Sequence, residues 1–329
     1  VPSSMSSLDA MRVQLEQINI AHRIIERYPD DLMLALTVDD IDEAMQEGKI
    51  ASLLGMEGGH TIVNSLGALR SYYELGVRYM TLTHFHSTDW ADSATGEVLH
   101  EGLTAFGREV VREMNRLGML VDLSHVSPNT MNDVLDIAEA PVIFSHSSAR
   151  ALTDHARNVP DSVLRRMPEN GGVVMVTFVP PYVSEERRLY EDGMIPLLMQ
   201  TTSDAEWEEV SARYREENGI PPVATLSHVA DHIEHVAQVA GIDHVGIGSD
   251  FYGATGDDLI EGLEDVSRFP DLIAELVRRG WSDEDLAKLS RGNLLRVFRV
   301  AEAVSAELRQ RRNPSLKTIE ELDGINSAN

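Results

Sequence analysis

Five short apolar segments of this chain each end on a residue that can bind a metal or move a proton: Glu57, His84, His125, His146 and Asp250. The segments show little polar alternation, which is typical of strands buried on both faces in a parallel sheet. In a (β/α) barrel, the carboxyl ends of such strands share one face, where side chains distant in sequence converge. The pattern therefore predicts an α/β fold of the (β/α)8 TIM-barrel type, with the functional residues at that face.

Six segments have the character of barrel strands, namely 50–56, 78–83, 119–124, 141–145, 172–178 and 244–249. Segments with helical periodicity lie between most of them, and one such segment, 7–28, opens the chain. A closed barrel of this type needs eight strands. We therefore expect the first two strands to precede Val1, so that this sequence is an N-terminally incomplete barrel.

Two segments depart from the alternation of strand and helix. Residues 180–222 are acidic and rich in proline, and they contain a polar helical piece near 204–217. They are predicted to be an insertion that leaves from the same carboxyl face and forms a wall of the substrate pocket or a dimer contact. Residues 313–329 are predicted to be a loose tail. The predicted organisation is therefore a single barrel domain over 1–312, with this insertion and a C-terminal tail.

Composition excludes several classes of function. The chain has 54 Asp and Glu against 28 Lys and Arg, a formal charge of −26, so phosphate backbones and anionic lipids should repel it. Cysteine is absent, which excludes disulfides, zinc–thiolate sites and a cysteine nucleophile. No apolar run is long enough to span a membrane, and no signal peptide is recognisable. We expect a cytoplasmic protein with no nucleic-acid or membrane partner, whose metal would bind histidine and carboxylate.

The strand-end residues favour a metal site. His125 and His146 end consecutive strands, and two neutral imidazoles with a carboxylate such as Glu57 are a common set for a hydrolytic metal. Any one of them alone is as easily a hydrogen-bonded strand-end group, but the coincidence of three favours a metal. Asp250 fits either a general base or an ordinary turn residue. At most one of His84 and His86 is expected to face the site.

Histidines elsewhere carry a weaker signal. His228, His232 and His235 share a helical segment with charged neighbours, which predicts a solvated surface. His60 follows two glycines and is predicted to shape that loop.

Six motifs resemble the membrane (renal-type) dipeptidase family, peptidase family M19, in order and with similar spacing from about Leu8 to Phe298. They are Gly-Met-Glu-Gly-Gly-His at 55–60, Arg-Tyr-Met-Thr-Leu-Thr-His at 78–84, Val-Asp-Leu-Ser-His-Val-Ser at 121–127, Phe-Ser-His-Ser-Ser-Ala at 144–149, Arg-Asn-Val-Pro-Asp at 157–161 and Gly-Leu-Glu-Asp-Val at 262–266. The family is a metal-dependent (β/α)8 barrel of the amidohydrolase type that cleaves dipeptides, usually with two zinc ions. The chain is similar to a soluble, bacterial-like member.

The resemblance implies a role for each candidate residue. Glu57 would bridge two metals, and His125 and His146 would bind one of them. Four further residues would handle the substrate: His84 at the scissile carbonyl or oxyanion, Arg157 at the C-terminal carboxylate, Tyr182 in contact with the dipeptide, and Asp250 at the proton of the attacking water. A homodimer is expected.

The sequence departs from the family at one motif. The family's other metal is held by a His-x-Asp pair at the end of the first strand, and no such pair occurs before Glu57. Either the pair lies upstream of Val1, which we favour, or the protein is a one-metal or inactive relative. Three functions stay open at this point: a zinc dipeptidase that tolerates a C-terminal D-residue, a related hydrolase of another amide, lactam or lactone, and a noncatalytic binding protein.

Overall fold

The computed structural model describes residues 1–5, 7–251, 253 and 259–325. They divide into two compact units. The first contains Val1–Ser145, Arg165–Val173 and Arg291–Asn329, and the second contains His146–Leu164 and Val174–Ser290.

A parallel sheet confirms the predicted strands and their sequential order. Its strands follow one another as β3 (Leu54–Glu57), β4 (Val77–Thr81), β5 (Leu120–Asp122), β6 (Ile143–Phe144), β7 (Val173–Val176) and β8 (Val245–Ile247). The fold is therefore α/β with a parallel sheet, as predicted, and the six predicted barrel strands each overlap one of these six.

The register of the sheet aligns the candidate residues. Glu57 pairs with Thr81 on β4, and Thr81 pairs with Asp122 on β5. The residues that follow these three positions therefore leave the sheet at the same edge. An irregularity between Leu54 and Gly55 shifts the β3–β4 register.

The first predicted strand, 50–56, is divided in the structure. Ile50–Ser52 forms β2, which pairs in parallel with β1 (Leu32–Leu34) in a separate two-stranded sheet, while β3 begins at Leu54. The prediction of one continuous strand was wrong, and β1 was missed. Three residues give too short an apolar run for β1 to stand out by periodicity.

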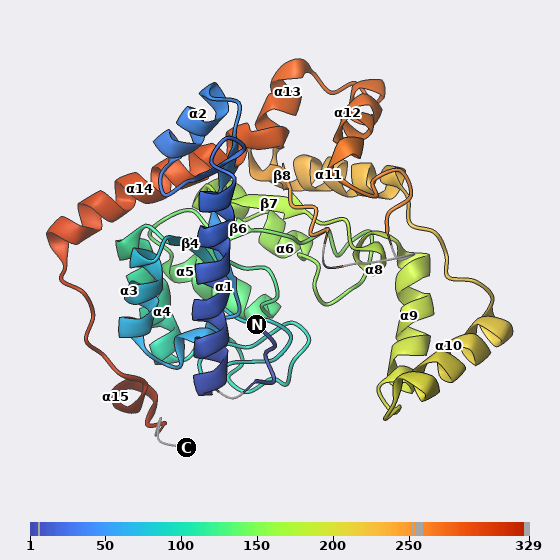
Figure 1. Ribbon diagram of the computed structural model, residues 1–329, viewed down its shortest axis with the longest axis horizontal. Helices are drawn as coiled ribbons and strands as arrows, with labels where there is room; N and C mark the ends of the chain where they lie inside the picture. The colour runs from blue at the N-terminus through green and yellow to red at the C-terminus, as the bar shows by residue number, and fades with distance from the viewer. Residues whose placement is uncertain (6, 252, 254–258, 326–329) are drawn as a thin grey trace. The chain divides into compact units, whose positions relative to one another are not determined.

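The first unit carries its helices around the strands β3 to β6. Their bounds are α1 (Ser7–Arg27), α2 (Val38–Gln46), the 3₁₀ turn η1 (Gly59–Ile62), α3 (Leu66–Glu74), α4 (Ala105–Leu117), α5 (Pro128–Ile137), α7 (Met167–Asn170), α14 (Asn293–Arg311) and α15 (Ile319–Asp323). Helices α3 and α4 lie side by side in Figure 1. Helix α4 shows how the sequence sets the ends: the Thr104 hydroxyl accepts the N–H of Gly107, and Gly118 ends the helix with a φ of 84°.

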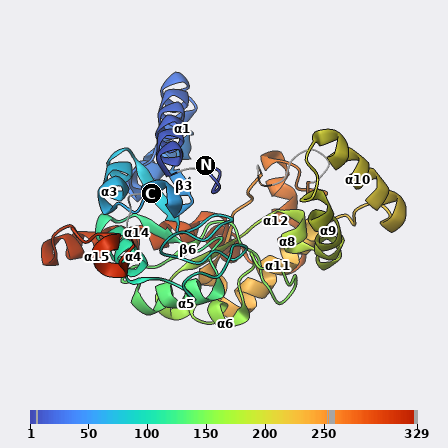
Figure 2. The same ribbon diagram turned by 90° about the horizontal axis from the view of Figure 1, so that it is seen from below.

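The C-terminal segment is not a loose tail as far as the structure describes it. Helix α15 lies beside α4 (Figure 2). The side chain of Ile319 is fully buried, and the carboxylate of Asp323 accepts the N–H of Phe106. This burial stabilises α15, whose five residues would be too short to form a stable helix alone.

The second unit contains β7 from Val174 onward, β8 and the remaining helices. These are α6 (Asp161–Leu164), α8 (Pro180–Val183), α9 (Glu185–Leu198), α10 (Asp204–Asn218), α11 (Leu226–Ala240), α12 (Phe269–Arg278) and α13 (Asp283–Ala287), with 3₁₀ turns η2 (Ile242–His244) and η3 (Val266–Arg268) and the π-helical turn η4 (Lys288–Gly292), which continues past the unit's end. The insertion forms α8, α9 and α10, and the Tyr214 hydroxyl donates to the Tyr190 carbonyl at 3.1 Å to join the last two. The structure confirms α10 as the predicted polar helix, whereas α9, which contains Pro196, was not predicted.

None of the helices in the described residues combines the length and the apolar character that crossing a bilayer requires.

Candidate functional site

Two predicted metal ligands, Glu57 and His125, lie together at the carboxyl ends of β3 and β5. The Glu57 Oε1 atom is 3.0 Å from Nε2 of His125. The other carboxylate oxygen, Oε2, is 3.8 Å from Nε2 of His84. The His125 side chain is almost completely buried, while the Glu57 carboxylate is 45% exposed, so the pair is open to solvent on the carboxylate side.

The third predicted ligand, His146, completes a set of atoms that could hold a metal ion. It comes two residues after the end of β6. Glu57, His125 and His146 each offer one ligand atom, and these atoms all lie within 4.8 Å of one another. Two imidazole nitrogens and one carboxylate oxygen are the donor set that catalytic zinc sites use.

The backbone of His125 has a conformation that is uncommon for histidine. Its φ is 74°, in the left-handed region that favours glycine. Three donors bind its carbonyl oxygen: the N–H of Ala94 at 2.7 Å, the Thr83 hydroxyl at 3.1 Å and the Ser93 hydroxyl at 3.3 Å. These bonds offset a strain of about 1–3 kcal/mol and fix the imidazole, and strain of this kind is concentrated at functional sites.

His84 and His86 both lie beyond the end of β4 at Thr81, and their side chains contact different partners. The His84 ring lies 4.6 Å from the His125 ring and 4.1 Å from the Phe85 ring. Nδ1 of His86 instead lies 2.6 Å from the Ser3 hydroxyl oxygen. His84 is therefore the one of the pair that faces Glu57 and His125.

Gly58 gives the chain room to turn after Glu57. Its φ is 110°, and a Cβ atom there would lie 2.5 Å from the His60 ring and 3.3 Å from Cβ of His84. Its N–H donates to the Thr81 hydroxyl at 2.6 Å. The predicted loop role of His60 agrees with its place in the turn η1.

Asp122, which was not a predicted site residue, supports the ends of β5 and β6. Its buried carboxylate oxygen Oδ1 accepts the N–H groups of Ser124 and Ser145, each at 3.0 Å. These bonds tie the end of β5 to the end of β6, and thereby the residues that carry His125 and His146. An acidic residue within an apolar strand was the signal that could have identified it.

In the second unit, the structure brings Arg157 and Tyr182 together. Cζ of Arg157 lies 5.5 Å from the centre of the Tyr182 ring. The guanidinium is almost completely buried and donates to the His146 carbonyl at 3.2 Å. A buried arginine keeps its charge and its planar set of donors, which suit a carboxylate.

His155 extends this group and was not a predicted site residue. Its ring lies 4.4 Å from the Tyr182 ring, and its Nδ1 accepts the N–H of Arg157 at 3.1 Å. Burial, together with a smaller effect of the positive charge of Arg157, lowers the pKa of His155 to about 4. His155 is therefore neutral at pH 7.

Asp250 follows β8 by three residues and also has a left-handed backbone, with a φ of 53°. Its carbonyl accepts the N–H of Gly253 at 2.8 Å, which closes a tight turn. Asp250 and His125 are thus two of the five described non-glycine residues with positive φ. Aspartate tolerates this region better than most residues, so the turn alone explains the conformation.

The histidines of α11 correct the prediction of a solvated surface. His232 is fully buried, His235 lies 2.8 Å from an Asp161 carboxylate oxygen, and His228 accepts the N–H of Thr225 at 3.0 Å. The helix packs His232 into the interior of the second unit and leaves His228 and His235 half-buried. Charged neighbours in sequence did not reveal this, because they lie on other faces of the helix.

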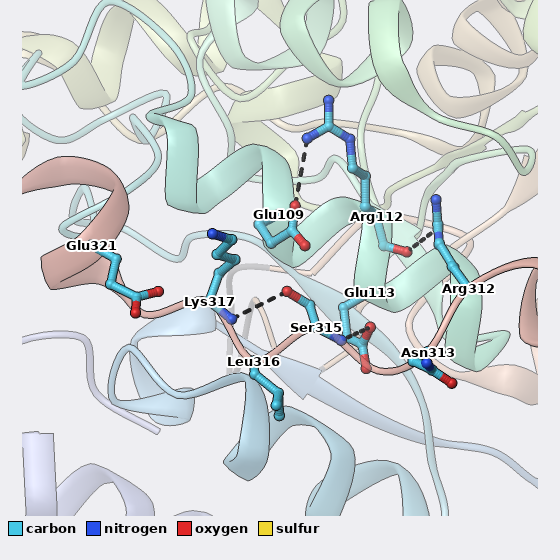
Figure 3. Close-up of a pocket in the computed structure, with 9 residues that line it drawn as sticks. All are labelled: Glu109, Arg112, Glu113, Arg312, Asn313, Ser315, Leu316, Lys317 and Glu321. Carbon is cyan, nitrogen blue, oxygen red and sulfur yellow. Dashed lines mark hydrogen bonds and ion pairs between the residues drawn. The ribbon is translucent and has the colours of Figure 1, made fainter.

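A cavity of about 480 Å³ in the first unit contains none of the predicted site residues (Figure 3). It is lined by α4 and the C-terminal segment, with equal numbers of acidic and basic side chains. Several of these groups bind one another. Arg112 forms an ion pair with Glu109, and the N–H of Ser315 donates to the Glu113 carboxylate. The cavity is therefore separate from the candidate site.

The chain is similar to known dipeptidases. A profile of the family described as membrane dipeptidase (peptidase family M19) matches residues 1–312. Dipeptidase tcpJ of Claviceps purpurea is 42% identical over 298 residues, which are 90% of this chain and 62% of that protein. Dipeptidase 3 of Rattus norvegicus is 41% identical over 309 residues, which are 92% of this chain and 55% of the rat protein. The chain thus spans only part of the length of these relatives.

Solved structures share the fold. The probable dipeptidase PvdM from Pseudomonas aeruginosa has a TM-score of 0.78 and 27% identity, covering 89% of this chain and 80% of that chain. A metallopeptidase from Rhodobacter sphaeroides, liganded with a phosphinate mimic of the dipeptide L-Ala-D-Ala, has a TM-score of 0.73 and 24% identity, covering 92% and 78%.

Proposed function

The chain belongs to the membrane dipeptidase family, peptidase family M19, and we propose on this basis that it acts as a zinc-dependent dipeptidase. The observation that carries the proposal is the convergence of Glu57, His125 and His146. Their donor atoms suit zinc, and the exposed side of the Glu57 carboxylate leaves room for substrate and water.

We propose Glu57, His125 and His146 as the zinc ligands. When bound, zinc supplies an electrophile and a water of lowered pKa. The identity of the metal and the number of ions, two in the family, belong to the proposal. Elemental analysis of the purified full-length protein tests both.

Arg157 and Tyr182 are proposed to bind the dipeptide. The planar guanidinium would pair with the C-terminal carboxylate in a bidentate manner, which distinguishes a dipeptide from an internal peptide bond. The contact between Arg157 and the Tyr182 ring supports this assignment, because it orients both groups.

His84 and Asp250 are proposed as the groups that act at the scissile bond. His84 would donate to the carbonyl oxygen as charge develops on it. Asp250 would accept the proton of the attacking water and pass it to the leaving amine. The place of Asp250, three residues after the end of β8, supports its assignment.

We also propose that the protein is a homodimer and that the insertion contributes to its contact. Apolar side chains of α9 and α10 are exposed, with Leu189 at 58% and Trp207 at 48%, and Met199 just after α9 at 81%. Exposed apolar groups of this size are frequent in interfaces. Sedimentation of the full-length protein, with and without Glu185–Gly219, tests the proposal. The cytoplasmic location expected from the sequence stays a prediction.

The test of function compares a free dipeptide with its C-terminal amide. The zinc-loaded full-length protein should hydrolyse dipeptides, L-Ala-D-Ala among them, and hydrolyse the amides poorly. Equal rates on both would indicate a broader amidohydrolase. Zinc binding without hydrolysis of either would indicate a binding protein.

A further inference from the structure

Two buried side chains of the second unit bind the loop that carries Arg157 to the helix that carries Tyr182. The first is Asn158, which is fully buried. Its amide nitrogen donates to the Tyr182 carbonyl at 2.8 Å and to the Thr153 carbonyl at 2.9 Å, and its oxygen accepts the N–H of Ser148 at 3.2 Å. Asn158 is adjacent in sequence to Arg157, so this connection is direct.

The second side chain is His232, which reaches the same two segments from α11. Its Nδ1 accepts the N–H of Ala149 at 3.0 Å. Its Nε2 lies 3.2 Å from the Val183 carbonyl and 3.3 Å from the Thr153 hydroxyl. Because Nδ1 accepts a hydrogen bond and a carbonyl faces Nε2, the proton of the neutral ring must be on Nε2.

The geometry makes the placement of Arg157 depend on His232. The loop is closed by a bridge between Ala149 and Val159, with the N–H of Val159 bonded to the Ser148 carbonyl at 2.8 Å. His232 accepts the N–H of Ala149, the first residue of this bridge. It also contacts the carbonyl of Val183, the residue that follows Tyr182. Removing the imidazole would leave a buried N–H and a buried carbonyl without this partner, and the loop and α8 would have to move to satisfy them.

We propose that His232 is a positioning residue that sets Arg157 and Tyr182 in the geometry that recognises the substrate's C-terminal carboxylate. The proposal rests on the proposed dipeptidase function. His232 itself touches neither the reacting bond nor the substrate, and it acts through the backbone of Ala149 and Val183.

Burial supports the neutral state that this role needs. It lowers the pKa of His232 to about 4, although the bond to the Val183 carbonyl acts in the opposite direction. A protonated ring would direct an N–H at the N–H of Ala149. At neutral pH the ring is therefore neutral and keeps its hydrogen bonds to Ala149 and Val183.

The test uses variants of His232 in the full-length, metal-loaded protein. His232→Leu removes both bonds and keeps an apolar side chain in the site. In His232→Asn the amide oxygen replaces Nδ1 toward Ala149, and in His232→Gln the amide nitrogen replaces Nε2 toward Val183. His235→Asn, on the same helix but bonded to Asp161, is the matched control.

The readout is kcat and KM for a dipeptide and for its C-terminal amide, together with metal content. His232→Leu should raise KM for the free dipeptide at least about 10-fold, as expected when a binding group is misplaced. The kcat/KM for the amide, which lacks the carboxylate, should change less than about 2-fold, so the preference for the free acid declines. His232→Gln and His232→Asn should each retain part of the preference, and metal content and His235→Asn should match the wild type.

Each other outcome has a distinct meaning. An equal loss on both substrates would show that His232 only stabilises the fold, and an unchanged preference would overturn the proposal. If His232→Leu does not fold, wild-type preference in both amide variants overturns it in the same way. A wild type that hydrolyses no dipeptide would refute the proposed function instead.

Discussion

Nε2 of His125 lies 3.0 Å from Oε1 of Glu57, although 68 positions separate the two residues in sequence. The contact depends on the register β3–β4–β5, which places Glu57, Thr81 and Asp122 in one row. It also depends on the left-handed backbone of His125, which directs the imidazole toward the carboxylate. Substitutions at Glu57 or His125 therefore test both the register of the strands and the proposal that the two residues bind a metal.

The first prediction is that Glu57→Gln weakens zinc binding. An amide replaces the negative charge of the carboxylate and is a poorer ligand for zinc, so the zinc dissociation constant should rise at least about 10-fold. Competition with a chromophoric chelator measures this constant. Glu47→Gln, whose carboxylate binds Lys49 at the surface, is the control and should bind zinc normally. Normal zinc affinity in Glu57→Gln would remove Glu57 from the ligand set.

The second prediction is that Asp122→Ala lowers the free energy of unfolding by about 2–4 kcal/mol. The change leaves the buried N–H of Ser124 without its acceptor, at about 1–3 kcal/mol, and the half-buried N–H of Ser145 without its own, at a smaller cost. Asp122→Asn keeps one oxygen acceptor and should cost less. Urea denaturation of the metal-free proteins measures the difference, and equal stability of all three would contradict the role of Asp122.

The third prediction concerns Asp250 and proton transfer. Asp250→Asn should bind zinc normally and lose turnover by at least about 10²-fold, the usual scale of general acid–base catalysis. Steady-state kinetics and metal analysis on the same sample give both quantities. A variant with full metal and full turnover would place the proton carrier elsewhere.

The fourth prediction concerns Arg157. Arg157→Lys should raise KM for free dipeptides at least about 10-fold, because a point charge replaces a planar pair of donors. The kcat/KM for amidated dipeptides should change little. Kinetics on matched free and amidated substrates decide the matter, and a uniform loss on both would argue against carboxylate recognition.

The fifth prediction concerns acid stability. In the unfolded chain, His155 and His232 bind protons below about pH 6.5, but in the folded chain their pKa is about 4 because both are buried. The stability that depends on their neutral forms is therefore complete above pH 6.5 and is lost as the pH falls to about 4. Urea unfolding as a function of pH should give a shallower slope across this window for His155→Asn and for His232→Asn than for the wild type. Identical slopes would mean that the two rings titrate normally in the folded state.

Strand periodicity and residue type predicted the sheet and most of the strand-end residues. Apolar runs mark strands buried on both faces, and a charged or imidazole group at the end of such a run is visible without knowledge of its neighbours. The contact of Glu57 with His125 follows from these two facts and from the parallel order of the strands.

The supporting residues could not be predicted, because their role depends on contacts between distant segments. His232 resembles a surface residue in sequence, yet it binds Ala149 and Val183 in the interior. The division of 50–56 into two strands likewise depends on the pairing of β2 with β1, which no local pattern shows. The helix α15 likewise depends on a distant contact, because burial of Ile319 in the first unit stabilises it.

The long separation between Glu57 and His125 bears on when the proposed metal would bind. Local chelating motifs, such as those of zinc fingers, bring their ligands together within a few residues, so the metal takes part in folding. Here the ligands meet only after β3, β4 and β5 have paired, and such non-local pairing is slow. The unfolded chain offers zinc single, separated ligands, so the ion should enter a sheet that is already formed. If the site binds zinc as proposed, the ion should mainly lower the unfolding rate and leave the folding rate unchanged.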